Sequence, residues 1–167
     1  MRIAHRFVAT LMLFCTFPLA VVSEERLETF DFDLGWEGIN NRSTHFDPRE
    51  ITQNFGYVPD MKLGSTSGAI GGTITPDARA AYYAKPLQAL SFDTPFSASG
   101  VLTMKEGGGN LLLGFFNSST LNEWRTPNTV VFRINGRGEI MHVHVEYLTS
   151  KWRAGAAIIG AYDKVAD

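Results

Sequence analysis

Short apolar stretches alternate with clusters of Gly, Pro, Asn, Asp and Ser along most of the chain. The long Leu-, Ala-, Glu- and Lys-rich runs that indicate helices do not interrupt this pattern. Many short strands separated by such turn signals are typical of an all-β sandwich or barrel. The pattern therefore predicts an all-β, jelly-roll sandwich of two antiparallel sheets.

The predicted strands occupy eight segments: 27–34, 49–58, 68–74, 80–87, 96–106, 110–117, 129–135 and 139–149. The stretch 35–44 breaks the strand pattern, and segment 68–74 is glycine-rich enough to be a strand or a bend. The segment 110–117 (NLLLGFFN) is apolar at successive positions, which predicts a central strand buried on both faces. The last two segments flank the turn GRG and predict a β-hairpin.

The sequence MHVHVEY in the last segment places unlike residues on the two faces of a strand. Because side chains alternate along a strand, His142, His144 and Glu146 share one face, and Met141, Val143, Val145 and Tyr147 share the other. We expect Met141, Val143 and Val145 to be buried. Two histidines and a carboxylate in this spacing suit a metal ion, but the motif is weak without further ligands, and the same residues suit the polar face of a half-buried strand.

The neighbouring predicted strand offers an extension of this polar row. Arg133 and Asn135 alternate with apolar residues in segment 129–135. Planar polar groups in a row on a concave sheet face can hydrogen-bond the hydroxyl groups of a sugar. We therefore favour a sugar-binding groove here and expect neither a metal nor another cofactor.

Two polar loops each combine an aromatic ring with amide and charged groups. Their candidate ligand-binding residues are Trp36, Asn40 and Arg42 in the first loop, and Asn122, Glu123, Trp124 and Arg125 in the second. Indole rings stack on sugar faces while amide and charged groups bind the hydroxyls. Alternatively, these residues buttress the loops. Glu37 and Glu123 also form a candidate acid pair for glycoside hydrolysis, for which the sequence gives no separation.

The N-terminus has the layout of a secretory signal peptide. Arg2 and Arg6 precede a short apolar run, which ends in small residues near Ser23. We expect residues 1–23 to be the signal, 24–155 the β-sandwich domain and 156–167 an irregular tail. The protein is then secreted or periplasmic, has no membrane span after cleavage, and loses its single cysteine, Cys15.

The formal net charge is −2 and the sequence has no Lys/Arg cluster, so it lacks the basic patch that nucleic-acid-binding proteins carry. Glycans are the expected class of partner, because of the polar row and the two polar loops.

The segment from Phe96 to Thr149, with its GFF motif before a loop and a strand, resembles the middle of a concanavalin A-like lectin/glucanase sandwich. The glucanase E-x-D-x-x-E pattern and a calcium-loop signature are absent from it. The stretches WEGINNR, GGTITP, AAYYAKPL, GFFNSSTLNEWRTPNT and KWRAG more closely resemble an uncharacterised family of secreted bacterial proteins. Members of that family continue with further strands, so the resemblance implies that this chain is truncated after Gly155.

Together these observations predict an exported glycan-recognition domain. Its expected ligand contacts are Trp36, Asn40, Arg42, Asn122, Glu123, Trp124, Arg125, His142 and His144, with Tyr82 as a further stacking surface. The alternatives are a polysaccharide hydrolase or lyase, the latter using His142, His144, Tyr147 and Arg133, and a non-catalytic structural envelope protein. Unpaired strand edges in a truncated sandwich also predict self-association.

Overall fold

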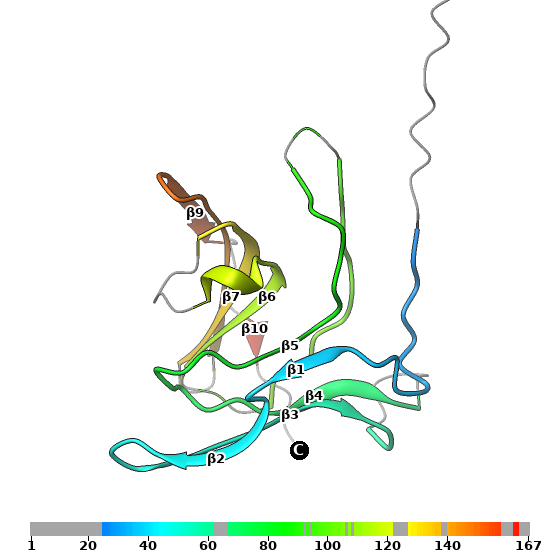
Figure 1. Ribbon diagram of the computed structural model, residues 1–167, viewed down its shortest axis with the longest axis vertical. Helices are drawn as coiled ribbons and strands as arrows, with labels where there is room; N and C mark the ends of the chain where they lie inside the picture. Colours follow the sequence, from blue (N-terminus) through cyan, green and yellow to red (C-terminus); the bar gives the residue numbers. More distant parts are fainter. Residues whose placement is uncertain are drawn as a thin grey trace, which may run out of the picture.

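The protein is all-β, with every sheet antiparallel, as the alternation of apolar and polar positions predicts (Figure 1). The computed structural model describes residues 25–61, 67–91, 93, 95–105, 107, 109–121, 127–137, 140–157 and 162–163. The predicted signal peptide therefore lies outside the described residues. Within the described part, no helix is long and apolar enough to span a membrane.

The described residues contain ten strands and one 3-10 helix. The strands of the first half are β1 (Glu37–Ile39), β2 (Arg42–Phe46), β3 (Glu50–Val58), β4 (Ala69–Thr73) and β5 (Tyr82–Ala84). The second half contains β6 (Asn110–Phe115), η1 (Ser118–Thr120), β7 (Thr129–Arg137), β8 (Ile140–Leu148), β9 (Arg153–Ala157) and β10 (Tyr162–Asp163).

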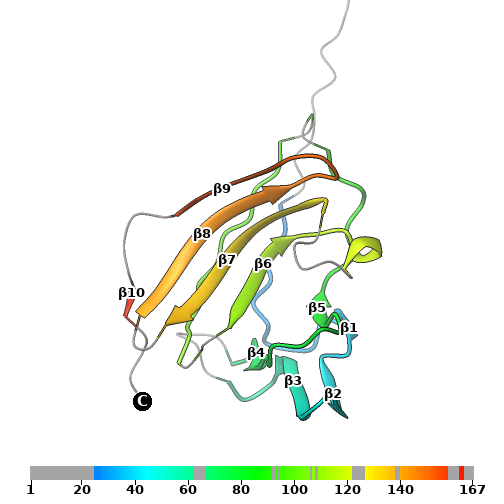
Figure 2. The ribbon, with the colours of Figure 1, turned by 90° about the vertical axis from the view of Figure 1, so that its left-hand side faces the viewer.

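These strands form three sheets within the described part of the chain. The order is β2-β3-β4 in one sheet and β1-β5 in the second. In the five-stranded third sheet the order is β10-β8-β7-β6, with β9 also paired to β8 (Figure 2). The two-stranded pair lies over the β2-β3-β4 sheet in Figure 1, and Asn41 at the β1–β2 turn donates to the carbonyl of Phe55 in β3 (2.6 Å).

The predicted hairpin is confirmed. β7 and β8 pair from Thr129↔Leu148 to Arg137↔Ile140, so they are adjacent antiparallel strands, and Gly136 and Arg137 of the predicted turn belong to β7. The glycine-rich segment also forms a strand, β4, at the edge of its sheet.

Other expectations for single elements are wrong. The segments 27–34 and 96–105 contain no strand, whereas β1 and β2 lie in the stretch predicted to break the pattern. β6 is at the edge of the five-stranded sheet rather than in its centre, and its Leu112 and Leu113 are 44% and 47% exposed. The predicted limit of the domain at residue 155 stays a prediction; it lies within β9, which pairs with β8.

The core lies in two places. Ile51, Phe55 and Ala69 are buried in the β2-β3-β4 sheet, and Val131, Ile134 and Leu148 in the five-stranded sheet. The buried amide of Gln53 is satisfied by the backbone of Thr75, to which it donates (2.6 Å) and from which it accepts (2.9 Å). The long segment between β5 and β6 rises beside the five-stranded sheet in Figure 1, and its Phe96 ring packs edge-on against Phe115 at 4.9 Å.

Candidate functional site

Polar side chains from three neighbouring strands meet on one face of the five-stranded sheet. The register places Asn135 opposite His142 and Arg133 opposite His144. It also places Asn110 of β6 opposite Asn135. Directly opposed residues share a face of the sheet, so the predicted extension of the histidine row by Arg133 and Asn135 is confirmed. We call this surface the polar face.

The polar face is held together by its own hydrogen bonds. Arg133 Nε donates to Glu146 Oε1 at 2.8 Å, and Arg133 Nη1 lies 3.4 Å from Asn110 Oδ1. Asn135 Nδ2 donates to the same Asn110 oxygen at 2.9 Å. Glu146 is 7% exposed, and a buried carboxylate needs such a charged partner. The guanidinium of Arg133 is therefore fixed in position rather than swinging freely in solvent.

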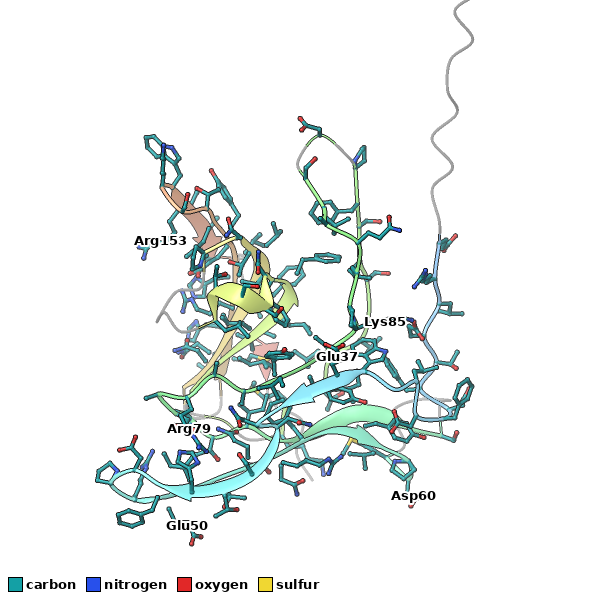
Figure 3. All side chains as sticks on the ribbon, in the orientation of Figure 1. Glu37, Glu50, Asp60, Arg79, Lys85 and Arg153 are labelled. Atoms are coloured by element: carbon teal, nitrogen blue, oxygen red, sulfur yellow. The ribbon has the colours of Figure 1, made fainter. Side chains whose placement is uncertain are left out.

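A hollow of about 210 Å³ opens on this face. Its walls come from β7, β8 and β9, and we call it the sheet hollow: Arg133, His144, Glu146, Arg153, Ala154 and Gly155. Arg153 projects from the outer side of the molecule in Figure 3. The preceding residue, Trp152, is 75% exposed. The sheet hollow thus offers two guanidinium groups and an imidazole, with an exposed indole next to Arg153 in the chain.

The burial predicted for β8 holds in part for its first half, where Met141 and Val143 are half-buried and His142 is exposed, and is wrong for its second half. Val145 is 43% exposed, whereas Glu146, expected outside or in a groove, is buried. The reason is that the polar face carries the Arg133–Glu146 pair, while the other side of the sheet is less covered at Phe132, which lies opposite Val145.

The register also bears on the two alternative chemistries of β8. Tyr147 pairs with Val130 and lies on the face opposite His142 and His144, so the predicted lyase residues do not converge. Glu146, the third residue of the His-x-His-x-Glu pattern, is engaged by Arg133. Among the described residues, no three His, Cys, Asp or Glu side chains are grouped to hold a metal ion.

The aromatic residue of the first polar loop lies within an aromatic cluster. The Trp36 ring is stacked on Tyr83 with centroids 5.9 Å apart and meets Phe30 edge-on at 5.5 Å. Its Nε1 is buried without a hydrogen-bond partner among the residues that the structure describes. Burial, followed by the charge of Asp33, raises the pKa of the Tyr83 hydroxyl. Trp36 is therefore half-buried in this aromatic cluster rather than on the polar face.

The other candidates of the first loop lie apart from the histidines. Arg42 donates to Asn54 Oδ1 at 3.2 Å and to the carbonyl of Tyr57 at 2.8 Å, both in β3. Asn40 has a positive φ of 52° and donates through Nδ2 to the carbonyl of Ala80 at 2.8 Å. Neither residue lines the sheet hollow.

The candidate residues of the second loop, Asn122, Glu123, Trp124 and Arg125, lie outside the described residues. The part of the loop that precedes them is described. Asn117 caps η1 by accepting a hydrogen bond from the backbone N–H of Ser119 at 2.9 Å. This turn brings Ser118 and Leu121 to a second hollow.

That second hollow is larger, about 540 Å³, and lies between the β1–β2 turn, the segment before β5, and η1. We call it the Arg79 hollow; its walls include Ile39, Asn40, Arg79, Tyr82, Ser118 and Leu121. The structure thus brings together Asn40 and Tyr82, two of the residues expected to bind a ligand.

Behind the Arg79 hollow lies a cluster of charged and polar side chains. The Asp77 side chain is 3% exposed, and its Oδ2 lies 3.2 Å from His45 Nε2 and 3.8 Å from Arg79 Nε. Asp77 Oδ1 accepts from the backbone N–H of Arg79 at 3.1 Å. The guanidinium of Arg79 also contacts His45 Nδ1.

This environment lowers the pKa of Asp77. Burial acts in the opposite direction and raises it, but the hydrogen bond from the Arg79 backbone and the charges of His45 and Arg79 outweigh burial. Asp77 is therefore a carboxylate at neutral pH and balances the charge of Arg79.

Sequence reasoning overlooked Asn110 and Arg153 of the polar face and the whole His45–Asp77–Arg79 cluster. Trp152 and Arg153 stand adjacent in KWRAG, which combines an aromatic ring with a guanidinium in the same way as the two polar loops. Asp77 and Arg79 carried no comparable signal, because their partner His45 is more than thirty positions away.

Comparisons with known proteins leave the family open. No protein-family model, no curated protein and no solved structure matches this chain.

Proposed function

We propose that the protein is a glycan-recognition domain that binds polysaccharide on its polar face. The supporting observation is the row of hydrogen-bonding side chains that the β6-β7-β8 register lines up around the sheet hollow. Amide, imidazole and guanidinium groups in fixed positions suit sugar hydroxyls, because binding then requires little further ordering of side chains.

The fold and location belong to the same proposal. The all-β architecture is compatible with a concanavalin A-like jelly roll, in which a curved sheet presents a groove to a sugar chain. Export by a signal peptide would place such a domain outside the cytoplasm, where polysaccharides are accessible.

Trp152, opposite Thr149 at the turn between β8 and β9, is an exposed ring at the end of the strand that carries Arg153. It is 75% exposed and directly precedes Arg153, which lines the sheet hollow. Aromatic rings give a sugar an apolar platform, and the neighbouring charged group fixes its orientation.

An array of soluble polysaccharides tests the proposal, with each glycan also checked for reaction products. Binding without turnover is expected. New reducing ends would indicate a hydrolase, and new unsaturated products would indicate a lyase. If no polysaccharide binds or reacts, the result would favour a structural protein.

A pair of matched variants locates the binding surface. Trp152→Ala should weaken binding to the best glycan by about 1–3 kcal/mol, the cost of losing an aromatic stack in nucleic-acid complexes. The control is Phe46→Ala, which removes an aromatic ring of 76% exposure from β2. Equal affinities of the two variants in isothermal titration would contradict a site next to Trp152.

A further inference from the structure

The Arg79 hollow has the features of a second binding site, separate from the polar face. It is formed by segments that are distant in the chain, namely the β1–β2 turn, residues 78–82 and η1. Its volume of about 540 Å³ lies in the range of small-molecule sites. The labelled side chains of Arg79 and Arg153 lie on the same side of the molecule in Figure 3.

The lining of the Arg79 hollow combines apolar residues, neutral polar residues and one charged residue. Ile39, Leu121 and the Tyr82 ring supply apolar surface, while Asn40 and Ser118 supply neutral polar groups. The Tyr82 ring is itself held in place by an edge-on contact with Phe116 at 5.3 Å. Arg79 is the one charged residue among the described residues of this lining, and its partner Asp77 lies outside the lining.

The Arg79 side chain is both anchored and accessible. Its Nε is 3.8 Å from the buried Asp77 carboxylate, and a terminal nitrogen contacts His45. Even so, the side chain is 46% exposed. Guanidinium groups that are held by a buried carboxylate present their remaining N–H groups in a fixed direction, which favours planar, bidentate recognition of a carboxylate.

The wall that carries Arg79 is also fastened to the rest of the fold. Asn40 Nδ2 donates to the carbonyl of Ala80, the residue after Arg79, at 2.8 Å. Asp77 accepts from the Arg79 backbone at 3.1 Å. The backbone on both sides of the guanidinium is therefore held before any ligand arrives, which lowers the entropy cost of binding.

We propose that the Arg79 hollow binds the carboxylate of a sugar acid, with the Arg79 guanidinium as the anion contact and the Tyr82 ring as the apolar wall. Asp77 is a positioning residue that holds Arg79. The sugar acid is either a free monosaccharide or one unit of an acidic polysaccharide. This site stands on its own contacts and does not depend on sugar binding at the polar face.

The test is a titration of the full chain with trigalacturonate, using the neutral galactose trisaccharide and acetate as comparison probes. Trigalacturonate should bind, the neutral trisaccharide should bind at least about tenfold more weakly, and acetate should compete at high concentration. Free galacturonate in a parallel titration distinguishes a single sugar acid from a chain. Absence of trigalacturonate binding to the native protein would overturn the proposal.

Variants then assign the contact to Arg79. Arg79→Gln should lower the affinity for trigalacturonate about tenfold or more. Arg79→Lys should lower it less, because lysine keeps the positive charge but lacks the planar pair of N–H donors that binds a carboxylate bidentately. The matched control is Arg49→Gln, which removes an exposed arginine from the β2–β3 turn. Equal losses in Arg79→Gln and Arg49→Gln would overturn the site.

Thermal unfolding separates binding from folding in the same variants. If Arg79→Gln fails to fold, Arg79→Lys and Ser118→Ala carry the test. A variant of Arg79 with a lowered Tm and native affinity would show that the cluster merely fastens the segment before β5 to β2, and would overturn the proposal.

Discussion

Asp77 stabilises the segment before β5 through contacts that require its ionised form. Its carboxylate is nearly buried between the side chains of His45 and Arg79. A carboxylate whose pKa is lower in the folded than in the unfolded chain binds fewer protons when folded. Its contribution to stability is therefore fully present above the ordinary pKa of 3.8 and is lost as the pH falls through the folded value.

We predict that Asp77→Asn lowers the free energy of unfolding at pH 7 and flattens its decline below pH 3.8. Urea unfolding at a series of pH values measures both effects. The control is Asp60→Asn at an exposed position after β3, labelled in Figure 3. A decline at acid pH that is as steep in Asp77→Asn as in the native protein would refute the role of this carboxylate.

Gly114 is a second residue whose identity the structure requires. It lies in β6 with φ at +149°, and a Cβ atom there would be 2.4 Å from the carbonyl oxygen of Val130. Gly114→Ala should destabilise the protein by about 1–3 kcal/mol, since the conformation is strained for any L side chain. At Gly100 a Cβ atom would meet nothing within 4 Å, so the control Gly100→Ala should be nearly neutral. Similar denaturation midpoints for the two variants would contradict the requirement for glycine at position 114.

Alternation predicts the polar face at the level of single residues, because one strand register fixes every cross-strand pair at once. Arg133, Asn135, His142 and His144 were all obtainable from local spacing. The position of Trp36 could not be predicted from local spacing, because it depends on ring contacts with Phe30 and Tyr83. Tyr83 is far from Trp36 in the chain. Local sequence contains no information on such a contact.

At the scale of elements, the β7–β8 hairpin is the centre of the five-stranded sheet. Ile134 is 2% exposed and lies opposite Val143, on the face away from the histidines. A charge at the half-buried Val143 would lie against the buried Ile134 without a partner, whereas the histidine face already carries polar groups.

Val143→Asp should therefore destabilise the protein by several kcal/mol, and His142→Asn should leave its stability nearly unchanged. The two substitutions are adjacent in β8, so they serve as controls for each other. Denaturant unfolding curves of the two variants measure this difference. Coincident curves would mean that Val143 and His142 are assigned to the wrong faces of β8.

Strands were predictable where long alternating or β-branched runs pair with a near neighbour, as in β3, β7 and β8. β9 was not, because its five residues are all exposed and it is a strand through backbone pairing with β8 rather than through apolar burial. The segment 96–105 shows the converse. It has apolar residues but no strand, and its Phe96 packs on Phe115 through the side chain.

At the scale of the whole molecule, the side of the five-stranded sheet opposite the polar face exposes large apolar side chains. Leu113, Phe132 and Val145 are 43–47% exposed, and β6 forms an edge of the same sheet. Apolar surface beside a strand edge favours association between chains.

We predict that the protein self-associates at micromolar concentration and that Phe132→Glu shifts it toward monomer. The control is Phe46→Glu, which adds the same charge at an exposed ring in β2. Sedimentation velocity measures the mass in solution. A native chain that sediments as a monomer, or equal effects of the two variants, would count against association through this face.

The most direct test of glycan binding on the polar face is histidine NMR during a titration with neutral oligosaccharides. Outside the N-terminal stretch the chain has three histidines: His142 and His144 on the polar face and His45 beside the Arg79 hollow. The imidazole signals of His142 and His144 should shift together with saturation, while His45 stays unchanged. Shifts confined to His45, or no shift with any glycan that binds, would contradict binding on the polar face.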